Sequence, residues 1–251
     1  MLALITGASS GIGRDMARVL AGMGWDLILV ARRKERLEEL KGELTAVSVQ
    51  IICADLERDD ECRRVYELTK DSSVDMLVNN AGFGLAGEFV DTDLDRELAM
   101  IDVNIRALHI LTKLFVRDFV AHDSGIILNV ASSAGFMSGP LLSTYYASKN
   151  YVLRLTEAIH EELRRRGSHV GISVLCPGPV NTEFDRVADV RFSVKGISSE
   201  YCARYAIQQA LRHRLIIIPS LMMKAGIALR HLVSERMLLR MSYNFQRRKN
   251  R

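Results

Sequence analysis

Residues 5–13 read Ile5-Thr6-Gly7-Ala8-Ser9-Ser10-Gly11-Ile12-Gly13, and this stretch decides the fold. An apolar run typical of a buried strand precedes it, and apolar residues at helical spacing follow it over residues 12–23. Such a turn gathers free backbone N–H groups at a helix N-terminus, which favours phosphate binding. We expect glycine there because a Cβ would hold the backbone away from a pyrophosphate or block positive φ angles. The spacing differs from G-x-G-x-x-G, so the turn alone indicates a dinucleotide only weakly.

Seven short apolar runs alternate with helical patterns along the chain. The predicted strands are residues 2–5, 26–31, 49–53, 76–78, 125–130, 170–176 and 215–218. The predicted helices are residues 12–23, 34–46, 59–70, 94–119, 143–165 and 200–212. This alternation indicates a parallel sheet covered on both faces. The fold class is therefore α/β, a doubly wound parallel seven-stranded sheet of the Rossmann type, with a single domain over residues 1–219 and a C-terminal helical extension over residues 220–251.

Composition agrees with one α/β domain, since 48% of the 251 residues are hydrophobic and 25% are charged. The four cysteines form no C-x-x-C pair, and no secretory pattern precedes the first strand. We therefore expect reduced thiols and a cytoplasmic protein. The histidines form no cluster with cysteines, so no metal site is predicted.

The residues at the ends of the predicted strands carry the chemistry, because ligands of doubly wound sheets bind there. After the second strand comes Ala31, followed by Arg32 and Arg33. An acid near this point suits the ribose of NAD, whereas an arginine suits the 2′-phosphate of NADP. The sequence therefore favours NADP over NAD, the alternative being that both arginines only begin a solvated helix. The next two strand ends add candidates for the adenosine side: Asp55, Leu56, Asn80, Ala81 and Gly82.

Tyr145 and Lys149 are four residues apart, so both side chains project from one face of a predicted helix. A nearby ammonium lowers the pKa of a phenol from its ordinary value of about 10. Ser132, just past the fifth strand, is placed to hydrogen-bond a substrate carbonyl. A Tyr/Lys pair is more often only surface packing. Tyr146 points about 100° away from Tyr145 and has no lysine one turn later, so we expect no role for it.

Four motifs occur in one order along the chain. They are Thr6-Gly7-x3-Gly11-x-Gly13, Asn79-Asn80-Ala81-Gly82, Tyr145-x3-Lys149 with Ser132 before it, and Pro177-Gly178 followed by Val180 and Thr182. With them, the chain resembles a short-chain dehydrogenase/reductase of the single-domain, NADP-preferring branch over residues 2–219.

The resemblance implies roles for individual residues. Ser132 would position the carbonyl, Tyr145 would transfer the proton, and Lys149 would lower the pKa of Tyr145 and hold the nicotinamide ribose. Asn104 would support a proton-relay water, and Thr182 would help to fix the carboxamide. The other implied cofactor contacts are Gly7, Ser9, Ser10, Gly11, Ile12, Gly13, Pro177, Gly178 and Val180. The chain departs from some NADP-preferring members at Ser10, where those carry a basic residue.

The predicted function is an NADP(H)-dependent oxidoreductase that acts on a carbonyl/alcohol pair, with reduction of an apolar substrate favoured. The alternative is a non-catalytic NADP-binding sensor or scaffold, against which Ser132 argues because binding alone does not need it. Nucleic-acid binding is not predicted, because no reading helix or aromatic RNA motif accompanies the basic tail.

Apolar residues near the strand ends are candidate walls of the substrate pocket, although such residues are equally often core. They are Phe83, Phe136, Met137, Leu141, Leu142, Phe184 and Phe192. Residues 183–199 are expected to form a flap over this pocket.

Two features suggest contacts with other molecules. The long helix over residues 94–119 carries more apolar surface than one sheet contact requires, which suggests a homo-dimer or homo-tetramer unless these residues simply pack on the sheet. They are Met100, Val103, Ala107, Leu111, Leu114 and Phe115.

Residues 221–251 form an amphipathic, basic tail that is too short and too charged to span a bilayer. The tail either lies on an anionic membrane surface or, as the pattern favours somewhat, folds back over the pocket or packs against another subunit.

Overall fold

A parallel sheet of seven strands forms the centre of the molecule, as the alternation of apolar runs predicts. The computed structural model describes residues 1–184, 196–230 and 233–247. Within them the strand order is β3-β2-β1-β4-β5-β6-β9, and all neighbours are parallel. The strands are β1 (Leu2–Thr6), β2 (Asp26–Ala31), β3 (Val49–Cys53), β4 (Met76–Asn79), β5 (Ile126–Val130), β6 (Gly171–Leu175) and β9 (Ile216–Ile217). The order reverses at β1 and β4, which places a ligand-binding crevice at the carboxyl ends of these strands.

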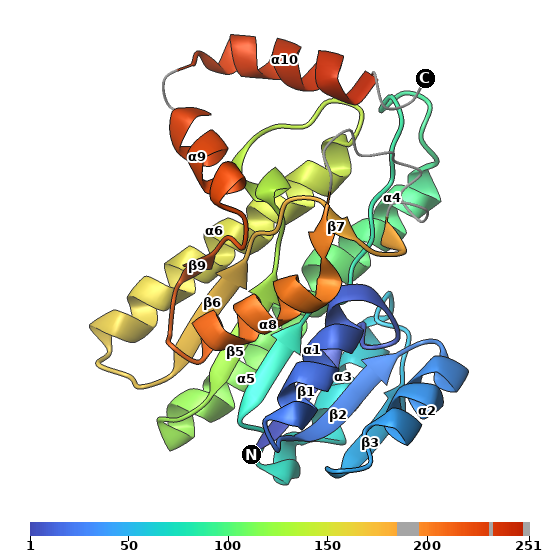
Figure 1. Cartoon of the computed structure of the whole chain (residues 1–251), viewed down its shortest axis with the longest axis vertical. Helices are drawn as coiled ribbons and strands as arrows, with labels where there is room; N and C mark the ends of the chain where they lie inside the picture. Colours follow the sequence, from blue (N-terminus) through green and yellow to red (C-terminus); the bar gives the residue numbers. More distant parts are fainter. Residues whose placement is uncertain (185–195, 231–232, 248–251) are drawn as a thin grey trace.

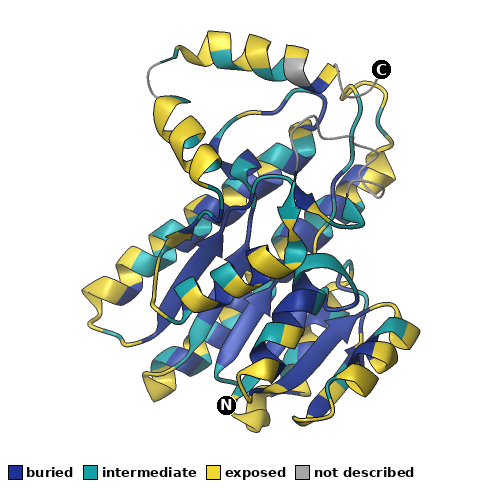
Figure 2. Ribbon diagram, viewed as in Figure 1, coloured by how far each residue is buried: buried dark blue, intermediate teal, exposed yellow. Residues whose placement is uncertain are grey.

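Helices cover both faces of the sheet (Figure 1). One face holds α1 (Gly11–Gly22), α2 (Lys34–Glu43) and α8 (Ser199–Ala210), and the other holds α3 (Asp59–Glu67), α5 (Leu108–His122) and α6 (Ser143–Arg165). Along β1, Ala3 and Ile5 enter the first core cluster, whereas Leu4 enters the second. This two-residue period explains why the strands are buried on both sides and read as continuous apolar runs (Figure 2).

The glycine turn between β1 and α1 is tied to the end of β4 by polar contacts. Thr6 Oγ1 accepts hydrogen bonds from the backbone N–H groups of Asn80 (2.9 Å) and Ala81 (3.0 Å). Asn80 Nδ2 donates to the carbonyl oxygens of Thr6 (3.0 Å) and Gly7 (3.2 Å). A Cβ on Gly13 would overlap the Asn80 amide and lie 2.6 Å from the Gly7 oxygen. Gly13 therefore makes room for Asn80, a reason different from the expected approach to a pyrophosphate.

The helix predicted over residues 94–119 is interrupted by a wider turn. It consists of α4 (Leu94–Ile101), a π-helical segment η2 (Asp102–Ala107) and α5, which ends three residues later than expected. Such segments are frequent at functional sites, and this one contains Asn104. Hydrophobic periodicity does not reveal it, because buried positions still recur every three or four residues through the segment.

The apolar residues that suggested self-association serve the core of a single chain. Met100, Val103, Ala107, Leu111 and Phe115 are all buried within it, and only Leu114 is partly exposed. The alternative, in which they pack on the sheet, is therefore right for five of the six, and they provide no argument for assembly.

Several short elements were not predicted from sequence. They are η1 (Lys70–Ser72), η3 (Ser133–Phe136), and the strands β7 (Val180–Asn181) and β8 (Ile197–Ser198), which pair with each other. The tail forms two helices, α9 (Leu221–Leu229) and α10 (Glu235–Arg247), beyond the carboxyl ends of the strands (Figure 1). Most of the expected flap over residues 183–199 lies outside the described residues.

We expect Gly13→Ala to lower the free energy of unfolding by about 1–3 kcal/mol, because the added methyl group must displace Asn80. Urea denaturation measures this change. The matched control is Gly22→Ala in the same helix, where a Cβ meets nothing within 4 Å. This control should leave stability unchanged or raise it by up to about 1 kcal/mol, and equal losses in both variants would contradict the role given to Asn80.

Candidate active site

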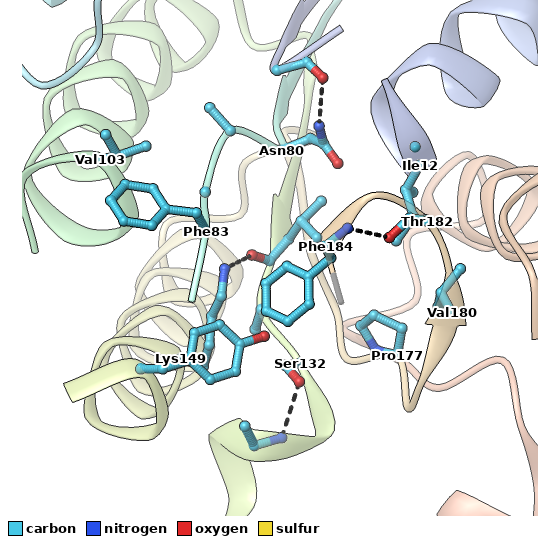
Figure 3. A pocket seen from close by; sticks show the side chains of 18 of the residues that line it. Ile12, Asn80, Phe83, Val103, Ser132, Lys149, Pro177, Val180, Thr182 and Phe184 are labelled. Atoms are coloured by element: carbon cyan, nitrogen blue, oxygen red, sulfur yellow. Dashed lines mark hydrogen bonds between the residues drawn. The ribbon is translucent and has the colours of Figure 1, made fainter. Parts of the chain in front are cut away.

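A large cavity of about 1050 Å³ opens at the carboxyl ends of the strands. It extends from the glycine turn, past the ends of β2, β3 and β4, to the N-terminal part of α6 (Figure 3). All the candidate site residues line it except Gly13 and Asn104. Those that line it are Gly7, Ser9, Ser10, Gly11, Ile12, Arg32, Arg33, Asp55, Leu56, Asn80, Ala81, Gly82, Ser132, Tyr145, Lys149, Pro177, Gly178, Val180 and Thr182. The volume lies at the upper end of ligand sites and is sufficient for a dinucleotide with a small substrate.

Lys149 is a buried ammonium group at the centre of this cavity. Only 5% of the residue is exposed, and its Nζ donates a hydrogen bond to the Val130 carbonyl oxygen at 3.0 Å (Figure 3). The Nζ atom lies 5.8 Å from the centroid of the Tyr145 ring. Burial lowers the pKa of Lys149 to about 8, since removal from water disfavours the charged form.

Tyr145 lies one helical turn before Lys149 and is also buried. Burial raises the pKa of its phenol above the ordinary value, and the hydrogen bond with Ser132 acts in the opposite direction. We expected the lysine to lower this pKa, but in this structure desolvation outweighs every other influence. Tyr145 is therefore a neutral phenol at physiological pH, which is the form that donates a proton.

Asn104 lies behind the cavity wall and joins three segments. Its Oδ1 accepts from the backbone N–H of Phe83 at 3.0 Å, and its Nδ2 donates to the Phe83 carbonyl oxygen at 2.9 Å. The same Nδ2 lies 3.1 Å from Ser148 Oγ, which in turn donates to the Tyr145 carbonyl oxygen at 2.7 Å. Asn104 thus holds the loop after β4 against the helix that carries Tyr145 and Lys149.

The two arginines after β2 point to different partners. Arg32 NH1 donates to Glu57 at 2.8 Å, at the edge of the cavity. Arg33 reaches back to the glycine turn, where its NH2 donates to Ser9 Oγ (3.1 Å) and Ser10 Oγ (2.8 Å). The structure therefore brings Arg33, rather than Arg32, to Ser9 and Ser10 of the glycine turn.

The residues fit a dinucleotide in shape. Gly7 and Gly11 have φ angles of +66° and +53°, which open the turn, and the hydroxyl groups of Ser9 and Ser10 lie beside it. A Cβ on Gly11 would approach Thr182 to 3.2 Å, so the turn and the Pro177–Thr182 segment lie close together. These two segments are the ones expected to hold the pyrophosphate and the nicotinamide carboxamide.

The other end of the cavity is mainly apolar. Four of the expected wall residues line it, namely Phe83, Met137, Leu142 and Phe184. Phe136 instead packs in the core beside Val152, and Leu141 is buried without lining the cavity. Phe192 lies outside the described residues.

The tail supplies wall residues that sequence reasoning did not place. They are Met223, Leu238, Met241, Ser242, Asn244 and Gln246. Gln246 Nε2 donates to the Tyr146 hydroxyl at 3.1 Å, and the Tyr243 hydroxyl donates to Glu88 at 3.1 Å. Tyr146 therefore lines the same cavity as Tyr145, and the expectation that it has no catalytic role stays a prediction. The sequence signal for these wall residues was the amphipathic pattern of the tail, and folding of the tail over the pocket was one of the alternatives. No helix within the described ranges has the length and apolar character needed to cross a membrane.

Comparisons with known proteins agree with this site. Residues 1–190 match the family model of short chain dehydrogenases. A very-long-chain 3-oxoacyl-CoA reductase of Anas platyrhynchos is 33% identical over 198 residues, which cover 76% of this chain and 63% of that protein. The chain spans roughly half to two thirds of the length of the first curated relatives it matches.

Two solved structures are similar over most of their length. A short-chain dehydrogenase from Sphingobium yanoikuyae in complex with NADPH has a TM-score of 0.82 and 33% identity, with 88% of each chain covered. A short chain dehydrogenase/reductase from Burkholderia phymatum in complex with NAD has a TM-score of 0.84 and 25% identity, with 92% of each chain covered. The motifs, the sheet order and these matches together show that the chain belongs to the short-chain dehydrogenase/reductase family.

Proposed function

We propose that this protein is an NADP(H)-dependent oxidoreductase that reduces the carbonyl group of an apolar substrate. The observation that carries the proposal is the joint placement of Ser132, Tyr145 and Lys149 in one cavity with the glycine turn. The family relationship and the reductase among the relatives support it.

The bound nicotinamide would supply the hydride, and the chain's own residues would bind and protonate the carbonyl. Ser132 and Tyr145 line the same cavity, where both hydroxyl groups would contact a carbonyl oxygen. The Tyr145 phenol then donates its proton as negative charge develops on that oxygen. Lys149 stabilises the phenolate that remains, because its ammonium is held beside the ring.

The protonation state of Tyr145 suits carbonyl reduction. The raised pKa of Tyr145 keeps the phenol protonated at neutral pH, and a protonated acid is what carbonyl reduction consumes. The apolar walls from Phe83, Leu142, Phe184, Met223 and Leu238 suit an apolar substrate rather than a sugar.

The preference for NADP rests on the arginines. Arg33 lies between the serines of the turn and the start of α2, where a guanidinium suits a phosphate. One structural neighbour holds NADPH and another holds NAD, so the family alone does not decide between them.

The non-catalytic alternative has no observation in its favour. A protein that only bound NADP would need the glycine turn and Arg33 but not Ser132 and a buried Tyr145 in the same cavity.

Assembly and location are further parts of the proposal. Self-association is supported by exposed apolar side chains on α4 and the loop before it, namely Phe89, Val90, Leu94 and Leu98. A cytoplasmic location is supported by the free thiols of the four cysteines. Peripheral membrane contact is supported by Leu221 and Met222 of α9, which are 80% and 61% exposed.

Tyr145→Phe should lower turnover by about 10²–10⁴-fold, because the proton donor is lost while the ring remains. NADPH oxidation with a panel of aldehydes and ketones of graded size measures this. The control is Tyr151→Phe, which removes an exposed hydroxyl that pairs with His109 on the outer side of the same helix. Near-normal turnover of the Tyr145→Phe variant would refute the proposed chemistry.

The pH profile of carbonyl reduction should break near the pKa of Lys149. Burial places that pKa at about 8, so the ammonium is present below this pH and is lost above it. The ratio kcat/KM should therefore fall by about tenfold per pH unit on the alkaline side. Lys149→Arg stays charged throughout this range and should be slower but lack the break; an identical break in this variant would assign it to another group.

Arg33→Ala should weaken NADPH binding by about one to two powers of ten and change NADH binding little, because a charge-assisted contact contributes roughly 1.5–3 kcal/mol. Fluorescence titration with both cofactors measures the two affinities. Arg32→Ala is the comparison, since its guanidinium faces Glu57. A larger NADPH-specific loss in Arg32→Ala would return the phosphate contact to Arg32, as the family resemblance implies.

A further inference from the structure

The carboxylate of Glu183 lies between two arginines at the start of α2. Its Oε2 accepts from Arg33 NH1 at 3.0 Å, and its Oε1 accepts from Arg36 NH1 at 2.8 Å. These two contacts hold the pKa of Glu183 down at about 2, so the side chain is ionised at any physiological pH. Both Arg33 and Glu183 line the cavity at the end where the glycine turn lies.

Arg33 has little capacity left for another anion. A guanidinium carries five N–H donors, and four hydrogen bonds already run from Arg33 to Ser9, Ser10 and Glu183. A phosphate that binds in the usual bidentate way needs two donors, so one of the present partners must leave. The serine hydroxyls are neutral and can remain beside a phosphate, whereas the carboxylate would repel it.

We propose that Glu183 is a cofactor-specificity residue, whose carboxylate occupies the place of the 2′-phosphate and is displaced when NADP(H) binds. This inference rests on the proposed NADP preference. Glu183 then lowers the affinity for NADPH without affecting NADH, which has no 2′-phosphate to compete. Glu183 therefore limits how much more tightly the protein binds NADPH than NADH.

Displacement of Glu183 also has a consequence at the other end of the cavity. Glu183 lies between Thr182 and Phe184 in the chain, and the Phe184 ring lies 5.4 Å from the Tyr145 ring between centroids (Figure 3). Release of the carboxylate from Arg33 and Arg36 removes two of the contacts that hold the segment carrying Phe184. Recognition of the 2′-phosphate is thereby linked to the position of an aromatic wall beside the proton donor.

The test is the affinity of the full chain for NADPH and NADH, measured by fluorescence titration in the wild type and in Glu183→Gln. The glutamine keeps the size of the side chain and removes its charge. NADPH should bind about five- to tenfold more tightly to Glu183→Gln, or about 1–1.4 kcal/mol, and NADH should stay within about twofold. Glu183→Asp keeps the charge and should bind NADPH more weakly than Glu183→Gln does.

The matched control is Glu43→Gln, which breaks the ion pair between Glu43 of α2 and Arg18 of α1 at 2.7 Å, away from the cavity. It should leave both affinities unchanged. If the wild type prefers NADPH and Glu183→Gln alters neither affinity, this inference fails while the cofactor proposal stands. If the wild type lacks the preference and Glu183→Gln gains it, the cofactor proposal fails while this inference stands. If neither the wild type nor Glu183→Gln prefers NADPH, the cofactor proposal and this inference both fail.

Discussion

The buried ammonium of Lys149 is the constraint on which the site depends. A charged group removed from water is costly unless it is paired or hydrogen-bonded, and the described residues provide one acceptor, the Val130 carbonyl oxygen at the end of β5. That contact fixes the position of α6 along β5 of the sheet. Because Tyr145 lies one turn before Lys149, the same contact sets where the phenol stands relative to Ser132, which follows β5 in the chain.

Side-chain hydrogen bonds hold the loops at the strand ends in fixed positions around this contact. Beneath the cavity, Asn129 of β5 accepts from Asn79 Nδ2 of β4 and donates to Thr156 of α6, each at 3.0 Å. Nearer the surface, Thr6 and Asn104 bind the backbone of the loop after β4 from opposite sides. These groups are buried, and their hydrogen bonds run to specific partners, although Asn79 Oδ1 has none among the described residues. The bonds therefore define one arrangement of β4, β5 and α6 rather than merely adding stability.

The sheet and most of the site could be predicted because they depend on local patterns. Continuous apolar runs identify buried parallel strands, and the geometry of such sheets places residues such as Asp55 and Asn80 at one edge. The π-helical segment was missed because its cause is distant in sequence: Asn104 is held by Phe83 and Ser148. Periodicity likewise gives the direction of Tyr146 relative to Tyr145 but not the width of the cavity that both line. The choice between Arg32 and Arg33 depends on which acids lie opposite each of them, and those come from other loops.

The placement of the tail means that the catalytic residues and much of the wall of the substrate pocket come from different parts of the chain. The match to the family model ends at residue 190, and it contains the glycine turn, Ser132, Tyr145 and Lys149. Met223, Leu238, Met241 and Gln246 lie beyond that match and close the apolar end of the same cavity. The residues that would support the proton transfer therefore lie within the part of the chain that matches the family model, whereas much of the wall that would select the substrate comes from α9 and α10. A change of substrate can then arise in these two helices without disturbing the buried contact of Lys149. Within the described residues, Gln246–Tyr146 is the one side-chain hydrogen bond that joins α10 to α6, and α9 packs through Ile227 against a core cluster to which α6 contributes, away from Lys149 Nζ.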